Sequence, residues 1–188
     1  MKRSILLLST VLFLGGCTSI IHSVTDKPIN PDPTNTSLGT DIDDLKLDTY
    51  IGVNIKKAHP DLESAHINVH AYNAVILLTG EVPSQKLKVL AGDTARNFHN
   101  VRQVHNELQV RGKTSIVSRT NDSLITAHVK TKLAFNKRVS ASRIKVITED
   151  SVVYMMGTIY RDMGATAANI AANTRGVKKV VRVFEYLD

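Results

Sequence analysis

Cysteine and tryptophan are almost absent from this chain of 188 residues. The sequence contains one cysteine, Cys17, and no tryptophan, and aromatic residues make up only 5% of it. A lone cysteine excludes a disulfide framework and a zinc site built on several thiolates. The folded part of the chain must therefore be held together by apolar packing.

Long hydrophobic runs are also lacking, apart from one at the N-terminus. Residues 5–14 are apolar except for Ser9 and Thr10, and the basic pair Lys2-Arg3 precedes them. A run of this length is too short for a permanent transmembrane helix. Because it follows basic residues, it predicts a secretion signal over residues 1–16.

Small residues lead from this run into the single cysteine, as Leu14-Gly15-Gly16-Cys17. The pattern resembles the lipobox of bacterial lipoproteins. The resemblance implies that the thiol of Cys17 carries diacylglycerol and that its new amine carries a further acyl chain such as palmitate. Because Thr18 stands where aspartate would retain such a protein in the inner membrane, it implies an outer-membrane anchor, with the folded part facing the periplasm. The alternative is an ordinary signal peptide with a chance cysteine, which would leave an unpaired thiol in a secreted protein.

Acidic residues are scarce in one part of the chain. The net charge is +7, but residues 42–112 contain 8 basic and 8 acidic residues, whereas residues 121–188 contain 11 basic and 6 acidic ones, a difference of +5. The second region is therefore the one expected to meet an anionic partner. Nucleic acid does not suit a secreted protein, so we expect anionic phospholipid headgroups, at roughly 1 kcal/mol per basic residue near the surface. The alternative is a solvated basic face without a partner.

Apolar periodicity is missing between the signal and the folded part. Pro28, Pro31 and Pro33 lie there among Asn, Asp, Thr and Ser. We expect residues 17–41 to form the lipidated cysteine and a flexible tether, which would reach on the order of 25–30 Å.

The remaining sequence is an internal duplication, in which apolar positions and glycines recur 76 to 78 residues apart. The matched pairs are Leu47/Ile125, Ile51/Val129, Ile55/Leu133, Ile67/Ile144, Val69/Val146, Gly80/Gly157, Val82/Ile159, Val101/Val177, Val104/Val180, Leu108/Phe184 and Val110/Tyr186. Each unit is predicted to run helix, strand, strand, helix, strand. The expected strands are 66–71, 75–82 and 101–111, then 143–148, 152–159 and 177–187, and the second helices are 84–98 and 161–174. The glycine in each second strand predicts a bulge or a close approach of two backbones.

Two tandem αββαβ units resemble BON domains, of which Gly176-Val177-Lys178-Lys179-Val180 is a typical ending. Together with the lipobox they resemble the dual BON-domain outer-membrane lipoproteins. The resemblance implies α+β domains over 42–112 and 121–188, joined by a linker over 113–120, each with two helices on a small three-stranded mixed sheet. It also implies that the protein is not an enzyme, has no cofactor besides the acyl groups on Cys17, binds anionic, phosphatidylglycerol-like phospholipid through the second domain, and supports outer-membrane integrity and division-site envelope processes.

The first helix of the second unit carries a candidate lipid-binding surface. Beside the stripe expected to pack on the sheet lies a second stripe, surrounded by basic residues. Exposed apolar tips ringed by cations suit a helix at a membrane surface. The second stripe is Leu124, His128, Thr131 and Phe135, and the basic residues are Lys130, Lys132, Lys137 and Arg138. The resemblance adds Gly157 and Thr158. Alternatively, Leu124 and Phe135 pack against the first domain or cap the core.

The sequence gives little support for a metal site or for catalysis. His66 and His70 flank a predicted strand and have no third ligand at a suitable spacing, so no metal site is expected. No nucleophile or nucleotide-binding motif predicts catalysis. The rival functions are a structural spacer of the envelope and a protein-interaction adapter. For the adapter, the resemblance suggests periplasmic envelope-assembly proteins or cell-wall amidase regulators as partners.

Overall fold

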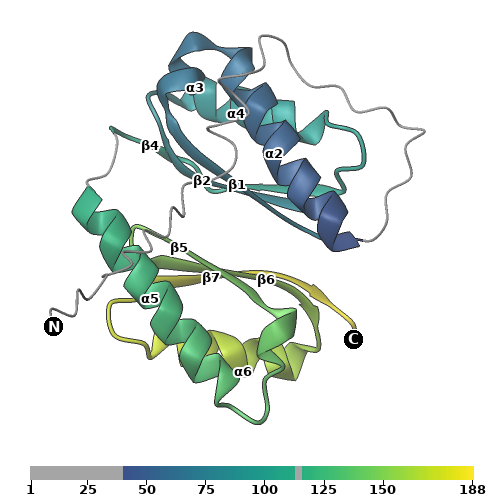
Figure 1. Cartoon of the computed structure of the whole chain (residues 1–188), viewed down its shortest axis with the longest axis vertical. Coiled ribbons are helices and arrows are strands. Elements are labelled where there is room, and N and C mark those ends of the chain that lie inside the picture. Colours follow the sequence, from purple (N-terminus) through teal and green to yellow (C-terminus); the bar gives the residue numbers. More distant parts are fainter. Residues whose placement is uncertain (1–39, 113–115) are drawn as a thin grey trace, which may run out of the picture.

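The computed structural model describes residues 40–112 and 116–188, which form two domains of one architecture (Figure 1). The first contains α2 (Thr40–Ala58), α3 (Pro60–Ser64), β1 (His66–Tyr72), β2 (Val75–Val82), α4 (Gln85–Arg96), β3 (Gln103–Asn106) and β4 (Gln109–Val110). The second contains α5 (Ile116–Ala134), the 3-10 turn η1 (Ala141–Arg143), β5 (Lys145–Glu149), β6 (Val152–Ile159), α6 (Arg161–Ala172) and β7 (Lys179–Tyr186). The expected α+β arrangement is therefore present twice.

Four local features differ from the sequence-based expectation. α3 and η1 were not expected, and α5 begins at Ile116, inside the span 113–120 expected as a linker. The third strand of the first domain is divided into β3 and β4. β3 ends at Asn106, whose side chain forms two hydrogen bonds with the backbone. Its Nδ2 donates to the Lys88 carbonyl at 2.7 Å, and its Oδ1 accepts from the Leu108 amide at 3.4 Å.

Both sheets are mixed, with the middle strand antiparallel to one neighbour and parallel to the other. β2 pairs antiparallel with β1 and parallel with β3 and β4, and β6 pairs antiparallel with β5 and parallel with β7. The helices of each domain cover one face of its sheet, over a separate apolar core. The fully buried core residues include Ile51, Ile55, Ile76 and Leu78 in the first domain and Val129, Val153, Met155 and Ile159 in the second.

The two remaining sheet faces pack on each other, so the helices form the outer layers (Figure 1). The apolar centre of this interface is formed by Val75, Leu77, Tyr154, Met156 and Val183. A polar rim surrounds it and joins the domains by ion pairs. These are Arg111 with Asp150 at 2.9 Å, Arg102 with Glu185 at 2.5 Å, and Lys145 with Asp48 at 3.6 Å.

The interface has approximate two-fold symmetry. His66 Nε2 lies 3.6 Å from a Glu149 carboxylate oxygen, and the Tyr72 hydroxyl donates to the Arg143 carbonyl at 3.4 Å. The two contacts occupy equivalent places in the repeat, because position 143 of the second domain corresponds to 66 of the first and position 149 corresponds to 72. The domains are therefore arranged like the subunits of an isologous dimer joined in one chain.

The second domain without the first is expected to dimerise through its uncovered sheet face. In such a dimer Arg143 takes the position of His66 and faces Glu149 of the second copy, and the apolar centre is buried again. Light scattering of residues 116–188 should therefore show a concentration-dependent dimer, and Tyr154→Lys should return it to a monomer. A fragment that stays monomeric at every concentration would contradict this symmetry argument.

The glycine of each second strand lies under a backbone carbonyl, as expected. A Cβ on Gly80 would stand 2.0 Å from the His66 carbonyl oxygen, and Gly80 has a φ of +113°. A Cβ on Gly157 would stand 2.3 Å from the Arg143 carbonyl oxygen. Both positions therefore require the absence of a side chain.

Each hairpin turn is held by an aspartate of the preceding helix. Asp44 accepts from the backbone amides of Asn73 and Ala74 at 2.5 and 3.0 Å, and Asp122 accepts from those of Asp150 and Ser151 at 2.8 Å each. All four turn residues have positive φ. Each carboxylate thus stabilises a left-handed turn built without glycine and fixes its helix against the sheet.

Candidate membrane-binding surface

α5 presents the predicted second stripe to solvent. Its other stripe, Ile125, Val129 and Leu133, is buried on the sheet of the second domain. Leu124 is consequently 56% exposed and Phe135 85% exposed. The first domain packs on the opposite face of that sheet (Figure 1). The alternative that these two side chains cap the core or dock on the first domain is therefore excluded.

The predicted cations lie around this stripe, but on two sides of it. Lys130 and Lys132 are two residues apart, about 200° around the helix, so they flank its outer face on opposite sides. Lys137 and Arg138 follow the end of α5, and all four side chains are exposed. His128 and Thr131 are exposed between the two apolar tips. Residues 123–140 include four basic side chains and no acidic one, so this segment gives the surface positive charge only.

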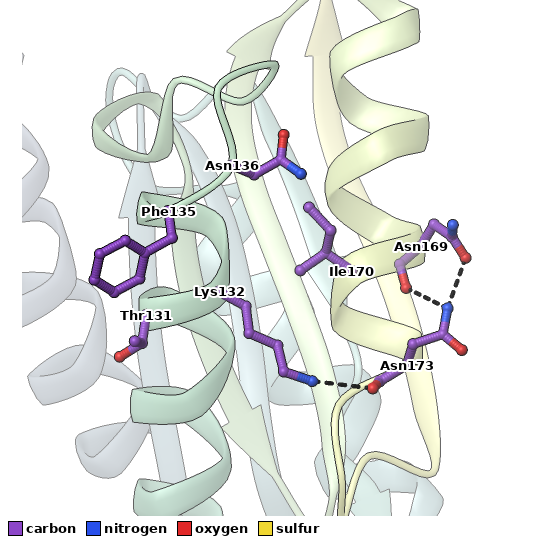
Figure 2. A pocket seen from close by; sticks show the side chains of 7 residues that line it. All are labelled: Thr131, Lys132, Phe135, Asn136, Asn169, Ile170 and Asn173. Atoms are coloured by element: carbon purple, nitrogen blue, oxygen red, sulfur yellow. Dashed lines mark hydrogen bonds between the residues drawn. The ribbon is translucent and has the colours of Figure 1, made fainter.

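A groove lies between the C-terminal ends of α5 and α6 (Figure 2). Its volume is about 470 Å³. Thr131, Lys132, Phe135 and Asn136 line it from the α5 side, and Asn169, Ile170 and Asn173 line it from the α6 side. In Figure 2 the Lys132 side chain points across towards Asn173, while the ring of Phe135 points away from the groove.

Sequence reasoning missed the α6 side of this groove and one further cation. Arg175 is exposed in the loop that follows α6. That loop packs against α5, because a Cβ on Gly176 would stand 3.0 Å from the Ile125 side chain. Arg175 is therefore an exposed cation in a loop that contacts α5, although it is about forty residues from Phe135 in the sequence. The one signal in the sequence was the duplication. It predicts a second helix over 161–174 on the same face of the sheet as the first, and so places the end of that helix near α5.

The first domain has no equivalent exposed apolar stripe, because Lys46 and Lys57 stand at the positions of Leu124 and Phe135 and the positions between them pack into the core. Val53, which corresponds to Thr131, is fully buried. Tyr50 and Phe98 correspond to His128 and Thr174, and their ring centroids are 6.4 Å apart. α3 adds the buried Leu62 to the same core. The exposed stripe is thus a property of the second domain alone.

Comparison with known proteins agrees with this architecture. Residues 43–112 and 121–188 both match the BON domain family. The chain belongs to the BON-domain family. It is 34% identical over 190 residues to Outer membrane lipoprotein DolP of Haemophilus influenzae, covering 100% of this chain and 97% of that protein.

Two further relatives share most of this BON-domain chain. The 21 kDa hemolysin of Actinobacillus pleuropneumoniae is 34% identical over 88% of this chain and 84% of its own length. Osmotically-inducible protein Y of Escherichia coli (strain K12) is 30% identical over 80% of this chain and 82% of its own length. The chain is accordingly a DolP-like outer-membrane lipoprotein with two BON domains. Cys17, the predicted lipidation site, lies outside the described residues. Within the described part of the chain, no helix is long and apolar enough to cross a membrane.

Gly157 and Thr158 of the second BON domain do not join the α5 surface. Gly157 is buried in β6 beneath the Arg143 carbonyl. The Thr158 hydroxyl lies 3.4 Å from Glu185, which also pairs with Arg102 of the first BON domain. The two residues that the resemblance added therefore lie apart from the exposed stripe, because successive residues of a strand point to opposite faces and neither reaches the exposed side of the helix.

The histidines of β1 belong to the interface between the BON domains. His66 faces Glu149, and Nε2 of His70 is buried without a hydrogen-bond partner in the described residues. Burial, together with the charge of Lys145, lowers the pKa of His70 to about 4. Among the described residues, no three histidine, cysteine or acidic side chains are grouped so as to hold a metal ion.

Proposed function

We propose that this BON-domain lipoprotein binds anionic phospholipid membranes through its second domain and thereby supports outer-membrane integrity and envelope processes at the division site. The observation that carries the proposal is Phe135, 85% exposed at the end of α5. A large aromatic side chain held in water beside several cations and no carboxylate is what a membrane-surface helix requires. Binding of this kind needs no catalytic group, so the proposed role is not enzymatic.

Two kinds of interaction would contribute to the binding free energy. Transfer of Leu124 and Phe135 out of water contributes roughly 1.5–3 kcal/mol for each fully buried side chain. Each basic residue that meets phosphate adds roughly 1 kcal/mol. Lys132 is four residues after His128 and three before Phe135, so it borders the apolar stripe and is best placed for those contacts. A basic surface of this type should discriminate anionic from zwitterionic membranes.

The proposed anchor would make weak binding sufficient. Acyl chains on Cys17 would hold the chain at the outer membrane with the domains in the periplasm, and residues 18–39 would tether them. A tethered domain meets its membrane at a high effective concentration, so an intrinsically weak headgroup interaction becomes persistent.

The test is flotation of residues 18–188 with vesicles containing phosphatidylglycerol. Leu124→Glu combined with Phe135→Glu is expected to reduce the bound fraction at least about tenfold, because two charges replace the inserting tips. Val89→Glu is the matched control, since Val89 is 47% exposed on α4 of the first domain. It should float like the wild type.

Equal flotation of the double variant and the wild type would exclude this surface. If no vesicle binds the wild type, but the same double variant loses a periplasmic protein in a pull-down, the adapter function replaces the lipid-binding one.

A further inference from the structure

We infer that the outer edge of β7 is a docking site for an extended, acidic segment of another protein, which would join the sheet as an added strand. β7 is the last strand of its sheet, and β6 is its only strand neighbour among the described residues. Within that part of the chain, no hydrogen bond from any other element reaches the β7 backbone. A row of unpaired amide and carbonyl groups is the template on which a peptide adds as a strand.

The other three sheet edges are shorter or already occupied. At the edge of β1, the Ala71 amide donates to Asp48, and the Ala71 carbonyl accepts from Lys145 Nζ at 2.9 Å. β5 has five residues, and the far edge of the first sheet is divided between the four residues of β3 and the two of β4. β7 has eight residues, and all of them pair with β6. It is therefore the longest continuous edge that the described residues leave open.

The duplication shows that this edge differs between the two domains. Arg182 stands at the position of Asn106, where β3 ends. The strand of the second domain continues through Arg182 to Tyr186. Lys179 likewise stands at the position of Gln103. The second domain thus has a continuous basic edge, whereas the first has a broken one whose strands contain no lysine or arginine.

Two cations mark the β7 edge, one on each face of the sheet. Val180 and Phe184 pack on the helix side, and Val183 is buried against the first domain. Because side chains alternate along a strand, Arg182 lies on the helix side and Lys179 on the other. Both are exposed, and neither has an acidic partner among the described residues. Carboxylates at the same spacing in an added strand would therefore meet both charges.

A second copy of β7 does not suit this edge. Antiparallel pairing of two copies about the middle of the strand would bring their Arg182 guanidinium groups together, and like charges at such positions are destabilising. The residues around Arg182 are valines and aromatics with a high strand propensity, so a central charge is what opposes self-association. The same charge favours an acidic strand, and it thereby selects the partner.

The β7 edge is separate from the surface on α5. β5 and β7 are opposite edges of the sheet (Figure 1). α5 packs on β5, whereas α6 packs on β6 and β7. The docking site therefore goes beyond the proposed function, and a protein partner and a membrane would contact different sides of the domain.

The test is a titration of residues 18–188 with the peptide Glu-Val-Thr-Glu-Thr-Val-Thr, whose glutamates have the spacing of Lys179 and Arg182. The peptide is expected to protect alternate backbone amides of β7 from hydrogen exchange, because an added strand bonds to every second residue of the edge. Attraction to the two cations alone would leave that exchange unchanged.

Charge reversal tests the choice of partner. Lys179→Glu combined with Arg182→Glu should weaken binding roughly tenfold or more, and the double variant should bind instead a peptide with lysine in place of both glutamates. Binding of the lysine peptide also shows that the variant is folded. Gln103→Glu, at the position of the first domain that corresponds to Lys179, is the control and should match the wild type.

Unchanged hydrogen exchange in β7, or equal binding of both peptides to the wild type, would overturn the docking site. A wild-type chain that sediments as a dimer and protects the same amides without peptide would assign the edge to a second copy instead. Tighter peptide binding after removal of residues 18–39 would assign it to the tether. Because no lipid is present, none of these results bears on the proposed function.

Discussion

Replacing Gly80 by alanine is expected to lower the free energy of unfolding of the first domain by roughly 4 kcal/mol or more. The new Cβ would stand 2.0 Å from the His66 carbonyl oxygen, and an L-residue would also have to adopt a φ of +113°. The oxygen cannot move away easily, because β1 is held along its length by β2 and by the second domain. Gly157→Ala has only the steric conflict, at 2.3 Å from the Arg143 carbonyl oxygen. It should cost less, roughly 3 kcal/mol.

Thermal unfolding, with hydrogen exchange read separately for the two domains, measures both effects. A loss of this size lowers the melting temperature of a domain of about 70 residues by roughly 12 °C or more. Gly112→Ala is the control, because a Cβ there would have nothing within 4 Å, and it should change stability by less than about 0.5 kcal/mol. A Gly80→Ala protein as stable as that control would show that the two backbones are further apart than described.

Replacing His70 by leucine is expected to change how stability depends on pH. The pKa of His70 is lowered from 6.5 to about 4, first by burial, then by the charge of Lys145, with Glu149 opposing. As pH falls below 6.5 the unfolded chain takes up this proton, whereas the folded chain does not until about pH 4. His70 therefore costs stability progressively between pH 6.5 and 4, up to roughly 3 kcal/mol. The leucine variant should lose this acid-dependent cost.

Asp48 has the opposite effect over a similar range of pH. Burial raises its pKa from 3.8 to about 6, against the charge of Lys145 and the hydrogen bond from the Ala71 amide, and with a small contribution from Asp44. The folded chain therefore takes up this proton first, and stability rises as pH falls from 6 to 3.8, again by up to roughly 3 kcal/mol. The two groups nearly cancel in the wild type.

Urea unfolding at constant ionic strength between pH 7.5 and 4 separates these contributions. Relative to the wild type, His70→Leu should gain stability towards acid and Asp48→Asn should lose it. Because both groups lie at the contact between β1 and Lys145 of the second domain, the double variant should restore a profile close to that of the wild type. Parallel curves for the wild type and His70→Leu would show that this histidine is hydrated in the folded protein.

The sequence was sufficient to predict the duplicated architecture. Offsets between apolar positions placed two helices and three strands in each repeat, since burial on a sheet imposes a period that survives in each copy. A close approach of two backbones was also expected at Gly80 and Gly157, because a glycine inside a strand is a local signal of one. The break between β3 and β4 was not predictable, because it depends on the Asn106 side chain reaching Lys88 on another element.

The candidate surface was predicted only in part. Spacing along α5 distinguished Ile125, Val129 and Leu133 from the stripe that includes Leu124 and Phe135, because residues three and four apart share a helix face. It did not show whether that second stripe was covered. In the first domain the same face contains Val53, which is fully buried, whereas in the second domain the face is open.

The sequence by itself therefore determined the lipobox-like signal, the two BON domains, and which domain and helix carry the positive charge. These features are local or periodic, and each can be read from neighbouring residues. Only the tertiary structure decided that Phe135 is exposed, that Asn169, Asn173 and Arg175 stand beside α5, and that Thr158 faces the first domain. Those relations join residues that are far apart in the chain. They depend on which sheet faces pack together, and that packing is set by the burial of apolar surface over the whole molecule.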